Sequence, residues 1–180
     1  YDVVIVDNLS NSSADVVDNI EKVSGIRPAF EKLDCLDLEG MDKLFTKYPG
    51  IKGIIHFAAS KAVGESVQKP LLYYRNNLVS LINLLELMPK HGVEGIIFSS
   101  SCTVYGQPDV LPVTEEAPIK KAESPYGNTK QINEEIIRDT VASGSPINAI
   151  MLRYFNPIGA HPTALIGEFP NGVPQNLLPY

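Results

Sequence analysis

Basic residues are too few and too scattered in this sequence to form a polyanion-binding surface. The 180 residues include 15 Lys and Arg against 21 Asp and Glu, a formal net charge of −6, without a cluster of Lys or Arg. Nucleic-acid binding needs concentrated positive charge. We therefore expect no nucleic-acid partner, whereas a small anionic molecule could still bind through backbone N–H groups and a few placed side chains.

Long apolar runs and cysteines are also scarce. No apolar run approaches the ~18 residues that suggest a membrane-spanning helix, and no signal peptide is visible. The two cysteines, Cys35 and Cys102, are far apart and have apolar neighbours. This pattern favours two buried free thiols in a reducing compartment. We expect a cytoplasmic protein that does not contact a membrane.

Motifs for two common kinds of catalytic site are missing. The three histidines, His56, His91 and His161, lack the spacing of metal ligands. The sequence has no Gly-x-Ser-x-Gly elbow, so serine-hydrolase chemistry has no support. We therefore expect no metal site and no serine hydrolase.

Apolar runs alternate with segments of helical periodicity along the chain. Strands are predicted at residues 1–7, 28–33, 53–59, 95–99 and 148–153, and helices at residues 14–23, 38–48, 70–90 and 126–143. The predicted strands are uniformly apolar, which is typical of a parallel sheet covered on both faces. The fold class predicted is α/β, an open doubly wound parallel sheet, with loops at residues 107–125 and 156–180.

The residues that follow the predicted strands are polar, small or aromatic. Ligands bind outside the carboxyl ends of the strands in such sheets. The residues at these ends are Asp7 and Asn8, Asp34, Phe57 to Ser60, Ser99 to Ser101, and Tyr154 to Asn156. A single polar strand end marks only the start of a loop, but five in succession favour a ligand cleft.

Asp7 ends the first predicted strand. An acidic residue at the end of the second strand of a dinucleotide fold binds the adenosine ribose, and its charge would repel the 2′-phosphate of NADP. Asp7 therefore favours NAD, although an Asx turn or a helix cap explains a single aspartate equally well. The Gly-rich loop of such folds is missing, and we expect that loop and the first strand to precede Tyr1.

Tyr126 and Lys130 form a Tyr-x-x-x-Lys pair. A helix places residues i and i+4 on one face, where the lysine ammonium can lower the tyrosine pKa and make the phenol a usable base. Tyr48 and Lys52 repeat the spacing, but Pro49 and Gly50 lie between them, so we interpret that copy as chance.

A hydroxyl from the serines at residues 99–101 would lie near this base. It could hydrogen-bond the reacting hydroxyl and pass its proton to Tyr126, although a serine-rich turn is the simpler alternative for the serines alone. A Ser-Tyr-Lys set suits hydride chemistry, in which the cofactor carries the redox step and the protein positions it.

Several motifs together resemble the UDP-galactose 4-epimerases, nucleotide-sugar enzymes of the extended short-chain dehydrogenase/reductase family. They are DNLSNSS, HFAASKAVGESVQKP, FSSSCTVYG, SPYGNTK and RYFNPIGAHP, and the similarity runs the length of the chain. SPYGNTK is shared with many sugar-nucleotide enzymes, whereas KAVGESVQKP and RYFNPIGAHP are closer to the 4-epimerases. Related dehydratases usually carry an acidic pair within the segment that reads SSSCTVYG here, and this sequence has none.

The resemblance implies a role for each candidate site residue. Cofactor-binding residues would be Asp7, Asn8, Leu9, Ser10, Asn11 and Ser12 at the adenosine ribose, Asp34 and Cys35 at the adenine, Phe57, Ala58, Ala59, Ser60 and Lys61 at the pyrophosphate and ribose, Asn76 at the cofactor-side backbone, and Phe155 at the nicotinamide. Catalytic residues would be Tyr126 as base, Lys130 as its modulator and a ligand of the nicotinamide ribose, and Ser101 as proton relay. All three would also belong to the cofactor-binding set. Substrate contacts would come from Lys61, Ser101, Tyr126, Asn156, Asn176 and Leu177.

The resemblance also implies the reaction and the partners. UDP-galactose and UDP-glucose would interconvert by NAD-dependent transient oxidation at sugar C4, in a homodimer paired through the helices at residues 70–90 and 126–143. Residues 1–155 would form the NAD-binding domain without its first strand, and residues 156–180 would begin the substrate-binding region, so this stretch alone should be inactive. The alternatives are another NAD-dependent nucleotide-sugar epimerase or dehydratase, and a non-catalytic NAD-binding relative.

Overall fold

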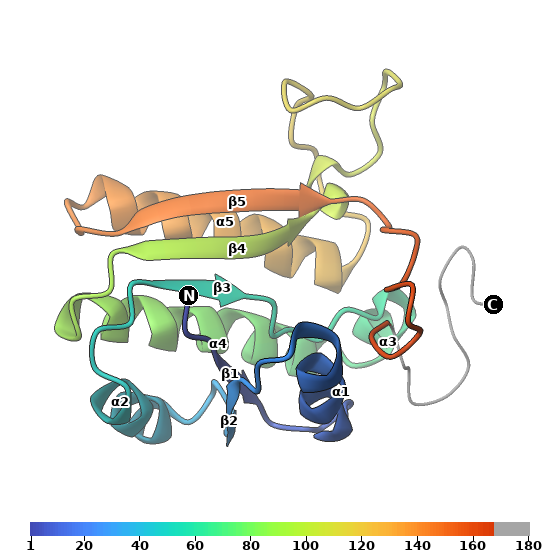
Figure 1. The fold of residues 1–180 in the computed structure, drawn as a ribbon. Coiled ribbons are helices and arrows are strands. Elements are labelled where there is room, and N and C mark those ends of the chain that lie inside the picture. Colours follow the sequence, from blue (N-terminus) through green and yellow to red (C-terminus); the bar gives the residue numbers. More distant parts are fainter. Residues whose placement is uncertain (168–180) are drawn as a thin grey trace. The chain divides into compact units, whose positions relative to one another are not determined.

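The computed structural model describes residues 1–167 of the chain (Figure 1). These residues divide into two compact units, one made of Tyr1–Asp34 with the segment from Asn156 onward, the other of Cys35–Phe155. Among the described residues, no helix is both long enough and apolar enough to cross a membrane.

The first unit contains one strand–helix–strand motif. β1 (Val4–Asp7) and β2 (Ala29–Lys32) pair in parallel, and α1 (Asp15–Ser24) connects them. Gly25 ends α1 with a left-handed backbone, φ 75°, which glycine adopts without a steric penalty. Residues 156–167 form turns and bends without a helix or strand, as predicted for this part of the tail.

The second unit contains a three-stranded parallel sheet in the order β3-β4-β5. Its elements in chain order are α2 (Leu38–Lys47), β3 (Gly53–His56), α3 (Val63–Gln68), α4 (Pro70–Lys90), β4 (Gly95–Ser101), the short 3-10 helix η1 (Cys102–Tyr105), α5 (Pro125–Ala142) and β5 (Asn148–Tyr154). Because all three strands run the same way, their carboxyl ends meet at one edge of the sheet (Figure 1).

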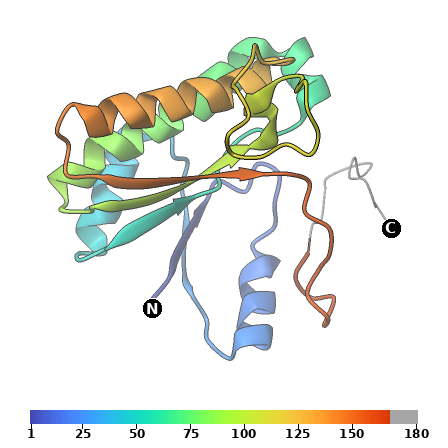
Figure 2. The ribbon, with the colours of Figure 1, turned by 90° about the horizontal axis from the view of Figure 1, so that it is seen from above.

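The core of this unit lies between the sheet and two helices. α4 and α5 run side by side over the same face of the sheet (Figure 2). α4 buries Tyr73, Leu81 and Met88, and the sheet contributes Ile96 and Phe98 from alternate positions of β4. Most leucines of α4 are therefore core residues.

The start of α5 is fixed by its capping residues. Ser124 is the N-cap, and its hydroxyl accepts a hydrogen bond from the Gly127 N–H. Pro125 occupies the first helical position, where a missing N–H costs nothing. Tyr126 thus becomes the second residue of a long helix, and Lys130 follows one turn later.

The predicted α/β class with parallel strands is confirmed, and several details differ from the sequence prediction. The described residues form two parallel sheets, because β1 pairs only with β2 and β3 only with β4. α3 was missed because its six residues are too few to give a helical pattern. β4 runs through Ser101, two residues beyond the prediction, because backbone pairing with Leu152–Tyr154 does not depend on apolar side chains.

The strands of the second unit's sheet carry exposed apolar side chains. Along β5, exposed and half-buried residues alternate, and Ile150 is 57% exposed. On β3, Ile55 is 62% exposed. Within the second unit, α4 and α5 pack over one face of this sheet.

Candidate functional site

Ser101, Tyr126 and Lys130 come together at the carboxyl edge of the second unit's sheet. Ser101 is the last residue of β4, and Tyr126 and Lys130 lie one turn apart at the start of α5. The Lys130 Nζ atom lies 5.8 Å from the centroid of the Tyr126 ring. The fold therefore assembles the three residues that the sequence assigned to catalysis.

The Lys130 ammonium group is held by the end of β4. Its Nζ atom donates a hydrogen bond to the Ser99 carbonyl oxygen at 2.7 Å and lies 4.9 Å from the centroid of the Phe98 ring. The side chain is almost fully buried, and this burial lowers the pKa of Lys130 to about 8. A lysine with such a pKa changes its charge near neutral pH.

The pKa of Tyr126 differs from the sequence expectation. Burial raises it above the usual value of 10, while a hydrogen bond with the Ser101 hydroxyl and the charge of Lys61 act to lower it. The sequence argument assigned the lowering to Lys130, but the Lys130 ammonium is directed to the Ser99 carbonyl. The cation that favours the phenolate in this arrangement is Lys61, an exposed residue of the β3–α3 loop.

The loop after β3 is fixed by an asparagine that the sequence analysis did not select. The Asn77 side chain accepts from the Ser60 N–H at 2.8 Å and donates to the Ser60 carbonyl at 3.0 Å. Asn76, which was expected to hold this backbone, donates instead to the Ser60 hydroxyl. Asn77 lies on the buried face of α4 and is 1% exposed. A polar residue at a buried helical position needs a hydrogen-bond partner, and this signal in the sequence could have identified it.

The first unit places the predicted ribose-binding residues in one turn around Asp7. The Asp7 Oδ1 atom accepts hydrogen bonds from the Leu9 N–H at 2.7 Å and from the Ser12 hydroxyl at 2.8 Å. Leu9 has a positive φ of 57°, which curls the chain back toward the carboxylate. Asn8 donates to the Asp34 carboxylate at 2.9 Å, so the ends of β1 and β2 are tied together.

The other predicted residues lie in several places. Phe57 and Phe155 are exposed, and Phe57 contacts Tyr154 with ring centroids 6.3 Å apart. Cys35 accepts a hydrogen bond at its carbonyl from Asn83. Ser10, Asn11 and Asn156 are exposed members of the first unit, and Ala58 and Ala59 follow β3. Asn176 and Leu177 lie outside the described residues.

Glu134 is a second residue that sequence reasoning missed. It is fully buried on α5, where its carboxylate accepts from the Ser100 hydroxyl and pairs with Arg138 and Arg153. Residues 130, 134 and 138 follow each other at the helical spacing of four, which places them on one face. This repeat of charged residues was visible in the sequence.

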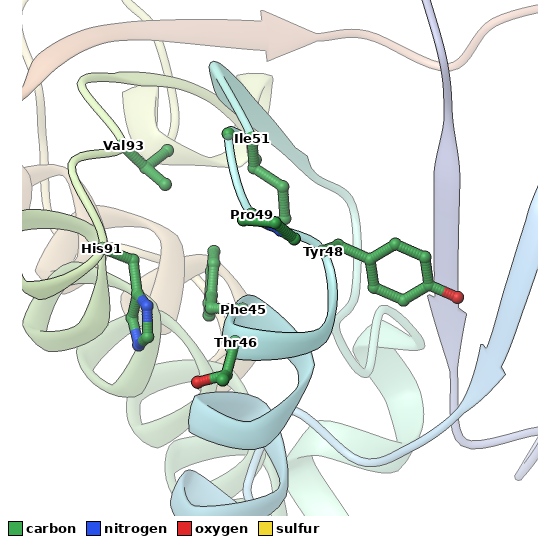
Figure 3. A pocket seen from close by; sticks show the side chains of 8 residues that line it. Phe45, Thr46, Tyr48, Pro49, Ile51, His91 and Val93 are labelled. Atoms are coloured by element: carbon green, nitrogen blue, oxygen red, sulfur yellow. The ribbon is translucent and has the colours of Figure 1, made fainter.

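A surface hollow of about 270 Å³ lies elsewhere on the second unit (Figure 3). Residues from α2, from the loop before β3 and from the end of α4 line it, with Phe45 stacked on His91. It contains none of the predicted site residues. Among residues 1–167, no group of three or more His, Cys, Asp or Glu could hold a metal ion.

Comparisons with known proteins find relatives along the whole chain. The chain is 49% identical to a Bacillus subtilis UDP-glucose 4-epimerase over 180 residues, which is 100% of this chain and 52% of that protein. It is 47% identical to the human UDP-glucose 4-epimerase over 183 residues, with 98% and 52% covered. The chain thus spans about half the length of the curated relatives it matches.

The solved structures that match the chain also include nucleotide-sugar 4-epimerases. A UDP-glucose 4-epimerase from Bifidobacterium longum, in complex with NAD+ and UDP, matches with a TM-score of 0.94 at 47% identity, over 98% of this chain and 52% of that one. A UDP-N-acetylglucosamine 4-epimerase from Methanobrevibacter ruminantium matches with a TM-score of 0.74 at 28% identity, over 88% and 48%. A family model described as the NAD dependent epimerase/dehydratase family matches residues 1–178. The chain belongs to the NAD dependent epimerase/dehydratase family.

Proposed function

We propose that the protein carrying this chain interconverts UDP-galactose and UDP-glucose by NAD-dependent transient oxidation at sugar C4. The observation that carries the proposal is the set of Ser101, Tyr126 and Lys130 at the carboxyl edge of the sheet. Curated relatives that match along nearly the whole chain include UDP-glucose 4-epimerases at 46 to 50% identity. The whole activity also needs the half of the protein that these relatives have beyond the aligned region.

The turn around Asp7 fits the adenosine ribose of NAD. In the described part of the chain, both side-chain hydrogen bonds of this carboxylate are made at Oδ1, which leaves Oδ2 for ribose hydroxyls. The negative charge at the end of β1 opposes the 2′-phosphate of NADP. We assign Asp7 to Ser12 and Asp34 to the adenosine side, and Phe57 to Lys61, Asn76 and Phe155 to the remainder of the cofactor.

The residues of the second unit would handle the proton of the sugar. When bound, NAD supplies the hydride acceptor and donor for C4. Tyr126 takes the proton of the C4 hydroxyl through its phenol oxygen, and Ser101 orients this hydroxyl by a hydrogen bond. Lys130 holds the end of β4 in place through the Ser99 carbonyl, and Lys61 favours the phenolate. The proton returns to O4 along the same path after C4 is inverted.

The domain organisation and the assembly follow from the same proposal. Residues 1–155 are assigned to the NAD-binding domain, and residues from 156 on, including Asn156, Asn176 and Leu177, to the substrate-binding region. We propose a cytoplasmic homodimer that pairs through α4 and α5. Apolar side chains exposed along α4 support this pairing, and Leu71 is 81% exposed.

The test is epimerisation by the full-length protein. We expect UDP-galactose to yield UDP-glucose without added reductant, and Tyr126→Phe to lower kcat about a hundredfold or more, because the phenol is the acid and base of the reaction. Chromatography of the UDP-sugars measures both rates.

Tyr48→Phe is the matched control. Tyr48 also precedes a lysine by four residues, but it caps α2 and lies at the hollow of Figure 3. Its replacement should leave kcat unchanged. Formation of a 4-keto-6-deoxy sugar, or net reduction of NAD, would show that the cofactor is right and the reaction is a different one of the same family. Binding of NAD without turnover would indicate a non-catalytic relative.

A further inference from the structure

Glu134 connects α5 and β4, which carry the candidate catalytic residues, with the neighbouring strand β5. Its side chain lies on α5, and the Oε1 atom accepts hydrogen bonds from the Ser100 hydroxyl at 2.6 Å and from the Arg153 Nε at 2.9 Å. The Oε2 atom accepts from Arg153 at 2.8 Å and from Arg138 at 2.6 Å. Ser100 belongs to β4 and Arg153 to β5, so one carboxylate links the helix to two neighbouring strands.

Because Glu134 is buried, its carboxylate needs all of these partners. Glu134 is 0% exposed, and a buried carboxylate is tolerated only when hydrogen bonds and opposite charges satisfy it. Burial by itself would raise the pKa of Glu134, but the bonds from Arg153 and Ser100 outweigh it and keep this pKa below its usual value. Arg153 also stacks over the Tyr105 ring at 4.8 Å, which fixes the guanidinium in turn.

The bond to Ser100 acts on both neighbours of that residue. The Ser99 carbonyl accepts the hydrogen bond of Lys130, and the Ser101 hydroxyl bonds Tyr126. Lys130 is one helical turn before Glu134 on the same helix. A shift of Ser100 against α5 would therefore change the placement of Ser101 and of Lys130 together.

We propose that Glu134 is a positioning residue, which aligns Ser101 and Lys130 with Tyr126 through its bond to Ser100. The inference rests on the proposed function for its kinetic consequence, and on the geometry of β4 and α5 for its structural one. Stability alone would not require this polar network, because apolar residues that replace a whole buried ion pair are often equally stabilising.

The experiment compares Ser100→Ala, Glu134→Gln and their double variant in the full-length protein, well below the measured unfolding temperature of each. For UDP-galactose turnover we expect kcat to fall about tenfold in Ser100→Ala and about a hundredfold in Glu134→Gln, with KM nearly unchanged, because misplacement of about 1 Å has such effects. The double variant should be no slower than Glu134→Gln, because the loss of the charge already weakens the contact with Ser100 that Ser100→Ala removes.

A second measurement does not depend on turnover. NMR titration of the Lys130 side chain, assigned with Lys130→Met, should give a pKa near 8 in the wild type. Loosening of β4 against α5 admits water, so both single variants should move this pKa toward 10.5. Glu135→Gln, the same exchange at the exposed neighbouring residue, should change neither kcat nor this pKa.

The outcomes separate the two proposals. A wild type that does not interconvert the sugars, with the lysine titration shifted in both variants, would overturn the proposed function and keep the positioning role. An active wild type with folded variants of normal kcat and an unmoved titration would overturn the positioning role. If Glu134→Gln does not fold, Ser100→Ala alone decides, since it removes only a hydroxyl.

Discussion

His56 is a buried titratable residue that the proposed reaction does not use. It ends β3, is 4% exposed, and lies against Phe98 with ring centroids 6.0 Å apart. Burial, and after it the charge of Lys130, lowers the pKa of His56 to about 4. In the folded state the imidazole is therefore neutral throughout the physiological range, and its neutrality is a condition for stability.

This pKa predicts a loss of stability in acid. The unfolded chain binds a proton at His56 below pH 6.5, whereas the folded chain does so only near pH 4. The contribution of the neutral His56 to the free energy of unfolding is therefore fully present above pH 6.5. This contribution, about 3 kcal/mol, is lost as the pH falls to 4. Urea unfolding of the wild type and of His56→Gln across this window should show the difference between them shrinking by that amount.

His161→Gln serves as the control for this measurement, because His161 is an exposed residue of the tail. Its unfolding free energy should follow the wild type at every pH. Equal pH dependence of His56→Gln and the wild type would contradict the burial argument.

At the scale of elements, the two ends of the loop between β4 and α5 are held together by hydrogen bonds. Gln131, on α5, donates hydrogen bonds to the Val104 carbonyl at 2.9 Å and to the Lys120 carbonyl at 2.5 Å. Gly106 lies where the beginning of this loop approaches its end at Lys120 and Lys121. Its φ of 59° and ψ of −139° form a backbone conformation that non-glycine residues avoid. This closure holds the segments that lead to Ser101 and to Tyr126.

Gly106→Ala should separate the two ends of this loop and lower the stability of the protein. A Cβ atom at Gly106 would lie 2.5 Å from the Lys121 carbonyl oxygen, so backbone strain and overlap add up to about 3 kcal/mol of lost stability. Thermal unfolding of the full-length variant measures the change.

Gly144→Ala separates the two causes of this loss. Gly144 also has a positive φ, 88°, but a Cβ atom there meets nothing within 4 Å. Its replacement should cost only the conformational penalty of about 1 kcal/mol. Equal losses of stability for Gly106→Ala and Gly144→Ala would show that the close approach of the two loop ends does not contribute to the effect.

At the scale of the whole molecule, α4 carries exposed apolar side chains on the side that the core does not use, interspersed with the exposed Arg75 and Glu86. The exposed apolar side chains are Leu71, Leu72, Val79 and Ile82, which fall within an arc of about 100° at 3.6 residues per turn. Such an arrangement is typical of a helix that packs against another surface. It is the part of the chain on which the proposed homodimer depends.

Leu71→Glu should therefore shift the full-length protein from dimer to monomer, because a charge at the pairing surface would lose its hydration. Light scattering coupled to size-exclusion chromatography measures the mass. Leu111→Glu is the matched control, the same exchange at a residue of the β4–α5 loop that is 77% exposed. A wild type that elutes as a monomer, or a dimer that Leu71→Glu leaves intact, would contradict pairing through α4.

The sequence by itself determined the order of the strands and of the longer helices, and it pointed to the members of the candidate catalytic set. Buried apolar runs, the Ser124-Pro125 start of α5 and the four-residue spacing of Tyr126 and Lys130 are local features, so they can be read without knowledge of distant contacts. The tertiary structure decided which groups surround these residues. Asn77 on Ser60, Glu134 on Ser100 and Lys130 on the Ser99 carbonyl join residues 17 to 34 positions apart, and only packing brings such partners within hydrogen-bond distance.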